Sequence, residues 1–220
     1  MSQLKQQSHC PLCLGENTDF YHADKRREYY QCENCQLVFV PPQYHLSKED
    51  EKAEYDKHEN ALNDEGYLRF LYRSIHPLIK HVKALSEDTV CGLDFGCGPA
   101  PALACEMKRL GYPMDIYDPY YFSDSACLAN EYDFVTCTEV VEHFASPKLG
   151  FEQIFSLLTE AGIAVVMTKL LIDKDRFTTW HYKNDPTHIA FYCKATFRFI
   201  AKKYGRSVVF EDTDVMVFKK

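Results

Sequence analysis

The sequence predicts a doubly wound α/β domain that ends in an antiparallel hairpin and follows a small cysteine-rich unit. Strand-like and helix-like segments alternate over residues 89–204, which is the pattern of a mostly parallel sheet with helices on both faces. Two C-x2-C pairs lie within the first 35 residues. The length of 220 residues suits one full domain with a small appendage.

The spacing of apolar residues locates the expected elements along the chain. A helical stripe predicts a helix over residues 67–85, with a kink at Pro77. Strands are expected over residues 89–95, 114–118, 132–138 and 163–169. Further helices are expected over residues 101–110, 149–160 and 194–204. The final hairpin is expected over residues 207–211 and 214–220.

Composition sets the domain boundaries that we expect. Pro41 and Pro42 end the cysteine-rich unit, which therefore spans residues 1–42. Residues 43–65 are strongly acidic and predict a solvated linker or helix. Residues 66–220 then form the α/β domain.

Charge and hydropathy disfavour several classes of protein. Lys and Arg number 25 against 32 Asp and Glu, and the formal charge of −7 argues against a large nucleic-acid footprint. No apolar run approaches the roughly 20 residues that span a bilayer. The N-terminus lacks the apolar stretch of a signal peptide. We therefore expect a cytoplasmic protein with no membrane span, whose ten cysteines are reduced.

The first four cysteines have the spacing of metal ligands. Cys10 and Cys13 form one C-x2-C pair, and Cys32 and Cys35 form another after 18 residues. Zinc prefers four tetrahedral sulfur or nitrogen ligands, and metal binding would supply the folding energy that so small a unit lacks. The spacing predicts a structural zinc ribbon. The alternative, a redox-active pair with two buried thiols, is disfavoured by the second pair.

A glycine-rich turn follows the first strand of the α/β domain. Residues 90–100 read VCGLDFGCGPA, in which Asp94, Gly96 and Gly98 lie between a strand and a helix. Glycines at this place let a ligand approach the backbone closely. Asp118 ends the next strand, 24 residues after Asp94, where a carboxylate can accept both hydroxyls of a ribose.

These segments resemble the class I S-adenosylmethionine-dependent methyltransferases, which have a Rossmann-like sheet. LDFGCGPAP is similar to their first motif, IYDP to their second-strand motif, and YDFVTCTEVVEHF to the segment after their fourth strand. The resemblance covers about residues 65–220. It implies S-adenosylmethionine as the cofactor and assigns its contacts to Asp94, Gly96, Gly98 and Asp118. Thr138, at the end of the fourth strand, is expected to contact the cofactor as well.

Two departures from that family matter. Ala100 stands at the usual third glycine, and only 14 residues separate Asp118 from Asp133. A helix and the third strand of the family must therefore be abbreviated, which leaves the adenine contact unassigned. A dinucleotide-dependent oxidoreductase is the alternative for the glycine turn, but Pro101 stands where its third glycine would be.

Acidic and histidine residues follow the strand that ends at Thr138. Glu139, Glu142 and His143 are expected on one side of a helix that begins there. E-x-x-E-H is similar to a motif of ubiquinone-pathway O-methyltransferases and small-RNA 2′-O-methyltransferases, and in the latter a later histidine, here His188, completes a metal site. One hypothesis is thus a divalent metal (Mg, Mn, Fe or Zn). The others are a metal-free catalytic role for His143, His188 and Glu142, or acids that only stabilise a helix N-terminus.

Two aromatic segments are candidates for the walls of the site. Trp180, Tyr182 and Tyr192 lie in the long connection after the fifth strand and are expected to contact the substrate; the alternative is an aromatic core beneath a long loop. Tyr55, His58 or Tyr67 could cap the site, although a charged surface helix is favoured there.

Together these features predict methyl transfer from S-adenosylmethionine, with an oxygen of a small metabolite as the expected acceptor. His143 and His188 are expected to handle the acceptor proton. Two rivals stay open. One is an RNA methyltransferase whose ribbon recognises nucleic acid, and the other is a non-catalytic protein that docks a partner through the ribbon.

Overall fold

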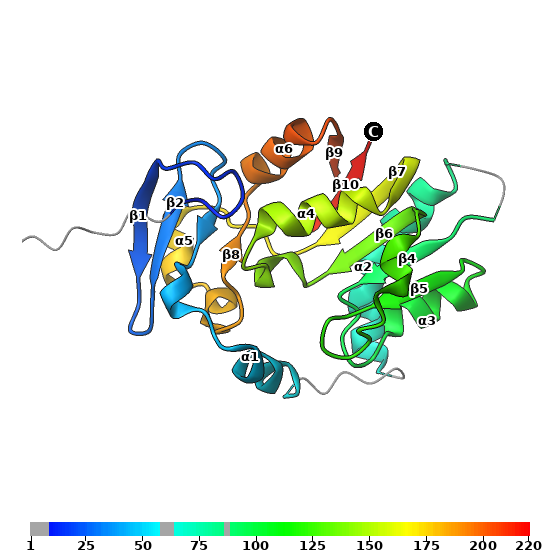
Figure 1. The fold of residues 1–220 in the computed structure, drawn as a ribbon, viewed down its shortest axis with the longest axis horizontal. Helices are drawn as coiled ribbons and strands as arrows, with labels where there is room; N and C mark the ends of the chain where they lie inside the picture. The colour runs from blue at the N-terminus through cyan, green and yellow to red at the C-terminus, as the bar shows by residue number, and fades with distance from the viewer. Residues whose placement is uncertain (1–8, 58–63, 86–88) are drawn as a thin grey trace, which may run out of the picture.

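The computed structural model describes residues 9–57, 64–85 and 89–220. Two sheets organise it: a six-stranded sheet in the order β5-β4-β6-β7-β10-β9 and a four-stranded sheet in the order β1-β2-β3-β8 (Figure 1). The larger sheet contains β4 (Gly92–Phe95), β5 (Met114–Tyr117), β6 (Tyr132–Thr138), β7 (Leu158–Met167), β9 (Ser207–Phe210) and β10 (Val215–Lys219). The α/β fold class is confirmed.

The larger sheet brings three strand ends to one edge. β5, β4, β6 and β7 are parallel, whereas β10 pairs antiparallel with both β7 and β9, so the predicted final hairpin is confirmed. Asp94 of β4 pairs with Ile116 of β5 and with Thr136 of β6. The residues that follow these strands therefore emerge side by side, where ligands bind in open α/β sheets.

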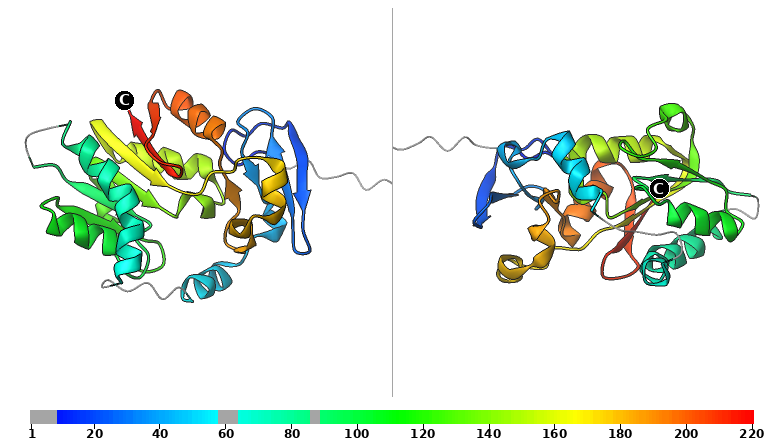
Figure 2. Two further views of the ribbon diagram at one scale, coloured as in Figure 1. Left: turned by 180° about the vertical axis from the view of Figure 1, so that it is seen from behind. Right: turned by 90° about the horizontal axis from the view of Figure 1, so that it is seen from below.

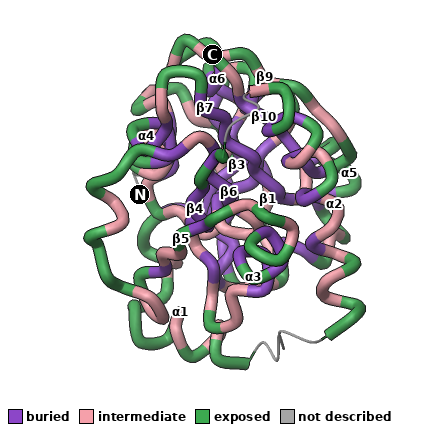
Figure 3. The backbone as a smooth tube through the Cα atoms, turned by 90° about the vertical axis from the view of Figure 1, so that its right-hand side faces the viewer, coloured by how far each residue is buried: buried purple, intermediate pink, exposed green. Residues whose placement is uncertain are grey.

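Helices cover both faces of this sheet (Figure 2). One face packs against α2 (Glu65–Val82) and α3 (Ala102–Arg109), and the other against α4 (Pro147–Ser156) and α6 (Lys194–Lys203). Side chains alternate between the two cores because successive residues of a strand point to opposite faces. Phe134 lies in the α2–α3 core and Val135 in the opposite one, both fully buried. Figure 3 shows the buried backbone gathered in the centre of the molecule.

The smaller sheet joins segments from both ends of the chain. β1 (Thr18–Ala23), β2 (Glu28–Cys32) and β3 (Val38–Phe39) come from the N-terminal unit, and β8 (Ala190–Phe191) comes from the connection before α6. Val38 pairs with Phe191, and Phe39 pairs with Ala190. The N-terminal unit is therefore continuous with the α/β domain through its sheet. The boundaries at residues 42 and 65 stay a prediction.

The two connecting regions hold short helices. The acidic segment contains the 3₁₀ helix η1 (Pro42–Tyr44) and α1 (Lys48–Tyr55), which Ser47 caps by accepting the N–H of Asp50. α1 lies between the N-terminal unit and the loops that follow β5 and β6 (Figure 1). The connection after β7 contains α5 (Lys174–Thr179) and the 3₁₀ helix η4 (His181–Asn184).

Several predicted elements differ in the structure. No helix begins at Glu139, because that residue adopts a left-handed backbone with φ +52°, and only the 3₁₀ helix η3 (Val141–His143) follows. The helix predicted to reach residue 160 ends at Ser156, because Leu158 already pairs with Tyr132. The expected abbreviation after β5 is confirmed, since the described residues 118–131 hold only the 3₁₀ helix η2 (Ser125–Ala129) and β5 is an edge strand.

Candidate functional site

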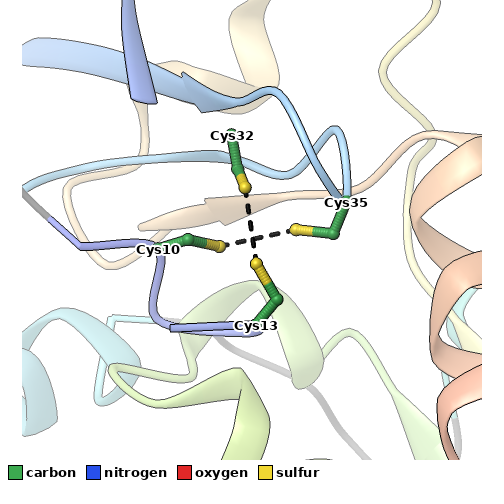
Figure 4. Close-up of side chains that lie close together, drawn as sticks. All are labelled: Cys10, Cys13, Cys32 and Cys35. Atoms are coloured by element: carbon green, nitrogen blue, oxygen red, sulfur yellow. Dashed lines mark hydrogen bonds between the residues drawn. The ribbon is translucent and has the colours of Figure 1, made fainter. Parts of the chain in front are cut away.

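The four N-terminal cysteines converge on one point (Figure 4). Their sulfur atoms all lie within 4.8 Å of one another, with Cys10 and Cys35 at 3.4 Å and Cys13 and Cys32 at 3.4 Å. A tetrahedral zinc site with Zn–S bonds of about 2.3 Å requires sulfurs about 3.8 Å apart. The donor set therefore fits zinc.

Two matching turns present these sulfurs. Leu14 and Gln36, which follow Cys13 and Cys35, both have a left-handed backbone, with φ of +62° and +61°. Each donates its N–H at 2.9 Å to the carbonyl of the first cysteine of its pair. The two C-x2-C segments thus fold into the same local shape, which explains why spacing alone identified them.

The glycine turn is tied to the end of β5 by Asp118. Gly98 donates its N–H to Asp118 Oδ2 at 3.0 Å, and the N–H groups of Tyr120 and Tyr121 donate to Oδ1 at 2.8 and 3.1 Å. A carboxylate has about four acceptor positions. Asp118 therefore keeps an acceptor position on Oδ2 for a ligand hydroxyl, and its predicted contact with the ribose stays a prediction.

The backbone of this turn requires glycine at two positions. Gly96 (φ +81°) packs against Val140, because a Cβ atom there would lie 2.5 Å from Val140 Cγ2. Gly98 (φ +64°) faces open space, since nothing lies within 4 Å of where its Cβ would be. The turn thus presents bare backbone on one side and contacts the segment after β6 on the other.

Buried polar groups line the adjacent strand ends. Asp94 is 4% exposed, accepts the Thr136 hydroxyl at 2.8 Å, and has its pKa raised to about 7 by burial. Among the described residues, three buried side-chain oxygens have no hydrogen-bond partner: Thr138 Oγ1, Glu139 Oε1 and Glu142 Oε2. They belong to consecutive parts of one segment. Unpaired buried oxygens are costly, so this cluster favours a bound ligand.

Glu142, His143 and His188 form the second group of candidate metal ligands. One donor atom from each lies within 4.8 Å of the others. His143 Nδ1 lies 3.2 Å from the Thr187 carbonyl, and His188 Nδ1 lies 2.7 Å from the Tyr182 carbonyl. A carbonyl only accepts hydrogen bonds, so each Nδ1 carries the proton. In the neutral rings, Nε2 is then left with a free lone pair.

Burial shifts the pKa values of this cluster toward the neutral forms. Burial, followed by the neighbouring His188, lowers the pKa of His143 to about 3. Burial, followed by the charge of Glu139, raises the pKa of Glu142 above its usual range. Tyr182 donates its hydroxyl to Glu142 Oε1 and lies 3.2 Å from Glu139 Oε2. Neutral imidazoles can accept a proton or bind a metal.

Glu139 does not join the other predicted ligands. The helical argument put it on one side with Glu142 and His143, but its left-handed backbone breaks that geometry. It contacts the group only through Tyr182. The predicted set of four metal ligands is thus corrected to three: Glu142, His143 and His188.

Tyr55 is the residue of α1 that reaches this cluster. Its ring lies edge-on to His143, with 5.2 Å between centroids, and 5.7 Å from Tyr120. The favoured interpretation of α1 as a charged surface helix therefore missed a contact of the site. His58 lies outside the described residues. Tyr67 lies in the first turn of α2, near Asp94 and Glu139.

The expected substrate wall is largely an aromatic core. Tyr192 is fully buried and donates its hydroxyl to the Val141 carbonyl at 2.8 Å, so its assignment to substrate contact is wrong. Trp180 and Tyr182 pack against each other at 5.1 Å in the core of the smaller sheet. Of the three, Tyr182 alone has a hydroxyl on the glutamates of the site.

Comparison with known families assigns the chain. Residues 59–210 match a family described as a methyltransferase domain. The chain belongs to that family. The methyltransferase domain therefore contains the glycine turn, Asp118 and the cluster of Glu142, His143 and His188.

A comparison with solved structures finds one that shares the fold of this methyltransferase domain and others that are less similar. The plantazolicin methyltransferase BpumL, in complex with a triazolic desmethylPZN analog and SAH, has a TM-score of 0.51 and 14% identity, covering 79% of this chain and 91% of that one. A SAM-dependent methyltransferase from Archaeoglobus fulgidus has a TM-score of 0.49 and 14% identity, covering 70% of this chain and 99% of that one. No protein with a curated description matches the sequence. Among the described residues, no helix is long and apolar enough to cross a membrane.

The methyltransferase domain also depends on residues that the sequence did not single out. Arg27, in the turn between β1 and β2, donates hydrogen bonds to three carbonyls of residues 183–186. Nothing in its immediate sequence signals this role, because its partners lie more than 150 residues away. Asp24 before it is a turn residue, which indicates only that the hairpin bends there.

Proposed function

We propose that this chain transfers the methyl group of S-adenosylmethionine to an oxygen of a small metabolite. The observation that carries the proposal is the pair of imidazoles whose Nε2 atoms make no hydrogen bond among the described residues, although His188 Nε2 lies 3.9 Å from Asp185 Oδ2, beside the unpaired Glu142 Oε2. Glu142 and His143 closely follow Val140, which packs against the glycine turn. A proton acceptor and a cofactor turn thus lie on adjoining segments.

The residues of the turn fit S-adenosylmethionine. Gly98 leaves open space above its backbone, and Asp118 keeps one acceptor position for a ribose hydroxyl. We assign Asp94, Gly96 and Thr138 to the same cofactor, because Thr138 Oγ1 is buried without a partner and Asp94 lies in the neighbouring strand. When bound, the cofactor supplies an electrophilic methyl group on a sulfonium.

The work left to this chain is to align the acceptor and to remove its proton. His143 or His188 accepts the proton at Nε2, because backbone carbonyls hold both rings by Nδ1. Glu142 is the second catalytic group: Tyr182 holds it through Oε1, and its unpaired Oε2 is placed to hydrogen-bond the acceptor hydroxyl. Tyr55 covers His143 and excludes water. Alignment of the reacting atoms supplies a large share of the rate in such reactions.

A divalent cation is an extension of this proposal. Glu142, His143 and His188 offer one carboxylate and two imidazoles within 4.8 Å of one another. Each imidazole donates its Nδ1–H to a backbone carbonyl, as metal-binding histidines commonly do with the nitrogen that does not bind the metal. A cation held there would lower the pKa of an acceptor hydroxyl. Mn²⁺ titration should give one site whose affinity falls at least tenfold in Glu142→Gln but not in Glu152→Gln, a surface glutamate paired with Lys148. Equal affinities would remove the metal from the proposal.

The N-terminal unit supports a small acceptor rather than RNA. We propose that it is a zinc ribbon with a structural role, in a cytoplasm that keeps its thiols reduced. Its sheet is completed by β8, and Arg27 is buried against residues 183–186. These contacts use surface that a recognition module would present to nucleic acid, and the charge of −7 argues the same way.

Calorimetry with S-adenosylhomocysteine tests the cofactor assignment. Gly98→Ala should weaken binding at least tenfold, because the new methyl group occupies the open face of the turn. Gly111→Ala is the matched control, since Gly111 also has a positive φ and open space around it, but lies after α3. No binding by the wild type would favour a non-catalytic protein.

A labelling experiment tests the acceptor. The protein is incubated with [methyl-³H]S-adenosylmethionine and either the small-molecule fraction or the total RNA of cells that naturally make it. We expect label in the small-molecule fraction, as an alkali-stable methyl ether or an alkali-labile ester. Label in RNA alone would overturn the proposed acceptor and establish the rival.

A further inference from the structure

The turn between β1 and β2 is built around Asp24. Its Oδ1 accepts the N–H groups of Arg26 at 2.8 Å and Arg27 at 3.1 Å, and its backbone N–H donates to the Arg27 carbonyl. Its Oδ2 accepts the hydroxyl of Tyr29 at 2.7 Å and lies 3.3 Å from Lys183 Nζ. The turn is therefore fixed from inside, and the stem of Arg27 starts from a defined place.

Arg27 is a buried cation with neutral partners. It is 6% exposed, and its guanidinium donates to the carbonyls of Lys183 at 2.7 Å, Asp185 at 2.8 Å and Pro186 at 3.0 Å. Its Nε donates to the Tyr29 hydroxyl at 3.0 Å. One planar group thus holds three carbonyls of a single loop. The planar fork of an arginine can do this, whereas the point charge of a lysine cannot.

The same loop orients both histidines of the site. The Tyr182 carbonyl accepts His188 Nδ1–H, and the Thr187 carbonyl accepts His143 Nδ1–H. These two carbonyls flank the three that Arg27 holds. Asp185 closes the loop by accepting both the N–H and the hydroxyl of Thr187. Releasing the Arg27 carbonyls would therefore free the two that fix the imidazole rings.

We propose that Arg27 is a positioning residue for the methyl-acceptor site, and that the N-terminal unit acts on catalysis through it. Arg27 holds residues 183–186 so that His143 and His188 keep the tautomer with a free Nε2. Naming these histidines the acceptor site rests on the proposed function. The hydrogen bonds from Arg27 to the loop do not depend on the proposed function, and their effect on the loop can be measured without turnover.

The test compares three variants of the full chain. Arg27→Met keeps a long side chain without donors, and Arg27→Lys keeps the charge without the fork. Arg26→Met is the matched control, because Arg26 is exposed and makes a single hydrogen bond to the same loop, to the Asn184 carbonyl at 2.7 Å. S-adenosylhomocysteine affinity, measured by calorimetry, reports whether the cofactor end stays folded.

Two readouts report on the loop. Long-range ¹H–¹⁵N spectra at pH 7.5 give the tautomer of each histidine, with His143→Gln and His188→Gln for assignment. Trp180 is the only tryptophan of the chain and lies 5.1 Å from the Tyr182 ring, so its fluorescence reports the same loop. In Arg27→Met we expect mixed tautomers for both histidines and acrylamide quenching of Trp180 at least twofold stronger, with S-adenosylhomocysteine affinity within twofold.

The outcomes separate this proposal from the proposed function. Unchanged tautomers and quenching in Arg27→Met would overturn the positioning role, and so would an equal disturbance in Arg26→Met. If Arg27→Met does not fold, Arg27→Lys decides, with mixed tautomers expected and wild-type tautomers contradicting. Failure of the wild type to bind S-adenosylhomocysteine would defeat the proposed function, yet leave both loop readouts interpretable.

Discussion

The two candidate metal clusters of this chain are built in opposite ways. The four cysteines come from one short stretch, adopt two copies of one turn, and present four like donors to a single point. Glu142, His143 and His188 come from two distant segments and present three mixed donors, beside three buried oxygens that lack a partner. The first set is complete in itself, whereas the second leaves acceptors unpaired.

This difference supports the proposal that the first cluster is structural and the second reactive. A closed set of four thiolates leaves no position for a substrate, so its binding energy goes into folding. The second cluster keeps neutral imidazoles and an unpaired carboxyl oxygen, which is unfavourable without a ligand but useful with one. Arg27 connects the two, because it lies in the turn between β1 and β2 of the N-terminal unit and donates to carbonyls of the loop that holds the second.

The largest expected effect is loss of the cysteine cluster. Structural zinc contributes about 10–16 kcal/mol to the folding of small zinc modules, so Cys35→Ser should lose the metal and unfold the N-terminal unit. Because β3 pairs with β8, the disturbance should reach Trp180 in the same core. Zinc per chain by mass spectrometry and Trp180 fluorescence measure the two effects.

Cys105→Ser is the control for that variant, since Cys105 is an exposed cysteine of α3. It should keep one zinc per chain and wild-type fluorescence. A Cys35→Ser protein with full zinc content would contradict the closed cluster. Loss of zinc with unchanged Trp180 fluorescence would instead show that the N-terminal unit does not affect the loop around Trp180, which would contradict the connection between the two clusters.

The second effect concerns His188. If His188 Nε2 removes the proton of the substrate hydroxyl, His188→Gln should lower kcat by about 10²–10⁴-fold, the usual contribution of a general base. S-adenosylhomocysteine affinity should change less than twofold, because His188 lies on the acceptor side. His181→Gln, an exposed histidine of the same connection, should leave kcat unchanged. Equal losses in the two variants would show that the loop, not the base, was damaged.

Local sequence was sufficient for the features whose atoms are close in the chain. The cysteine cluster and the glycine turn are each made by a few consecutive residues, so spacing determined them. The doubly wound α/β class and its final antiparallel hairpin also followed, because the alternation of strands and helices leaves few arrangements. Gly96, Gly98 and Asp118 indeed lie together at one strand edge.

Features that depend on distant contacts could not be predicted in this way. Glu139 was expected on a helix, but its left-handed backbone arises where β6 meets the packed Val140. Tyr192 lies on an aromatic-rich segment that reads as a pocket wall, and its burial depends on Phe151 and Phe197. Arg27 has no local signal, because its acceptors are carbonyls, which every residue carries.

The smallest expected effect is the pH dependence that Glu142 contributes to the second cluster. Burial, followed by the charge of Glu139, raises the pKa of Glu142, so the folded chain keeps a proton that the unfolded chain has lost. The free energy of unfolding should therefore fall as pH rises from about 5 toward 8. Glu142→Gln removes this contribution, and wild type should lose stability relative to the variant by at most about 1.4 kcal/mol per pH unit.

Urea unfolding of both proteins at pH 5.5, 6.5 and 7.5 measures that difference, and contributions common to both, such as the lowered pKa of His143, cancel. A constant difference would mean that Glu142 is already ionised in the folded chain at pH 5.5. Mn²⁺ then sharpens the comparison: a cation on Glu142 must displace its proton, so it should abolish the difference in slope between the two proteins and leave the slope of Glu142→Gln unchanged. The cysteine cluster has no such carboxyl, so a slope that persisted in the variant would have to arise elsewhere.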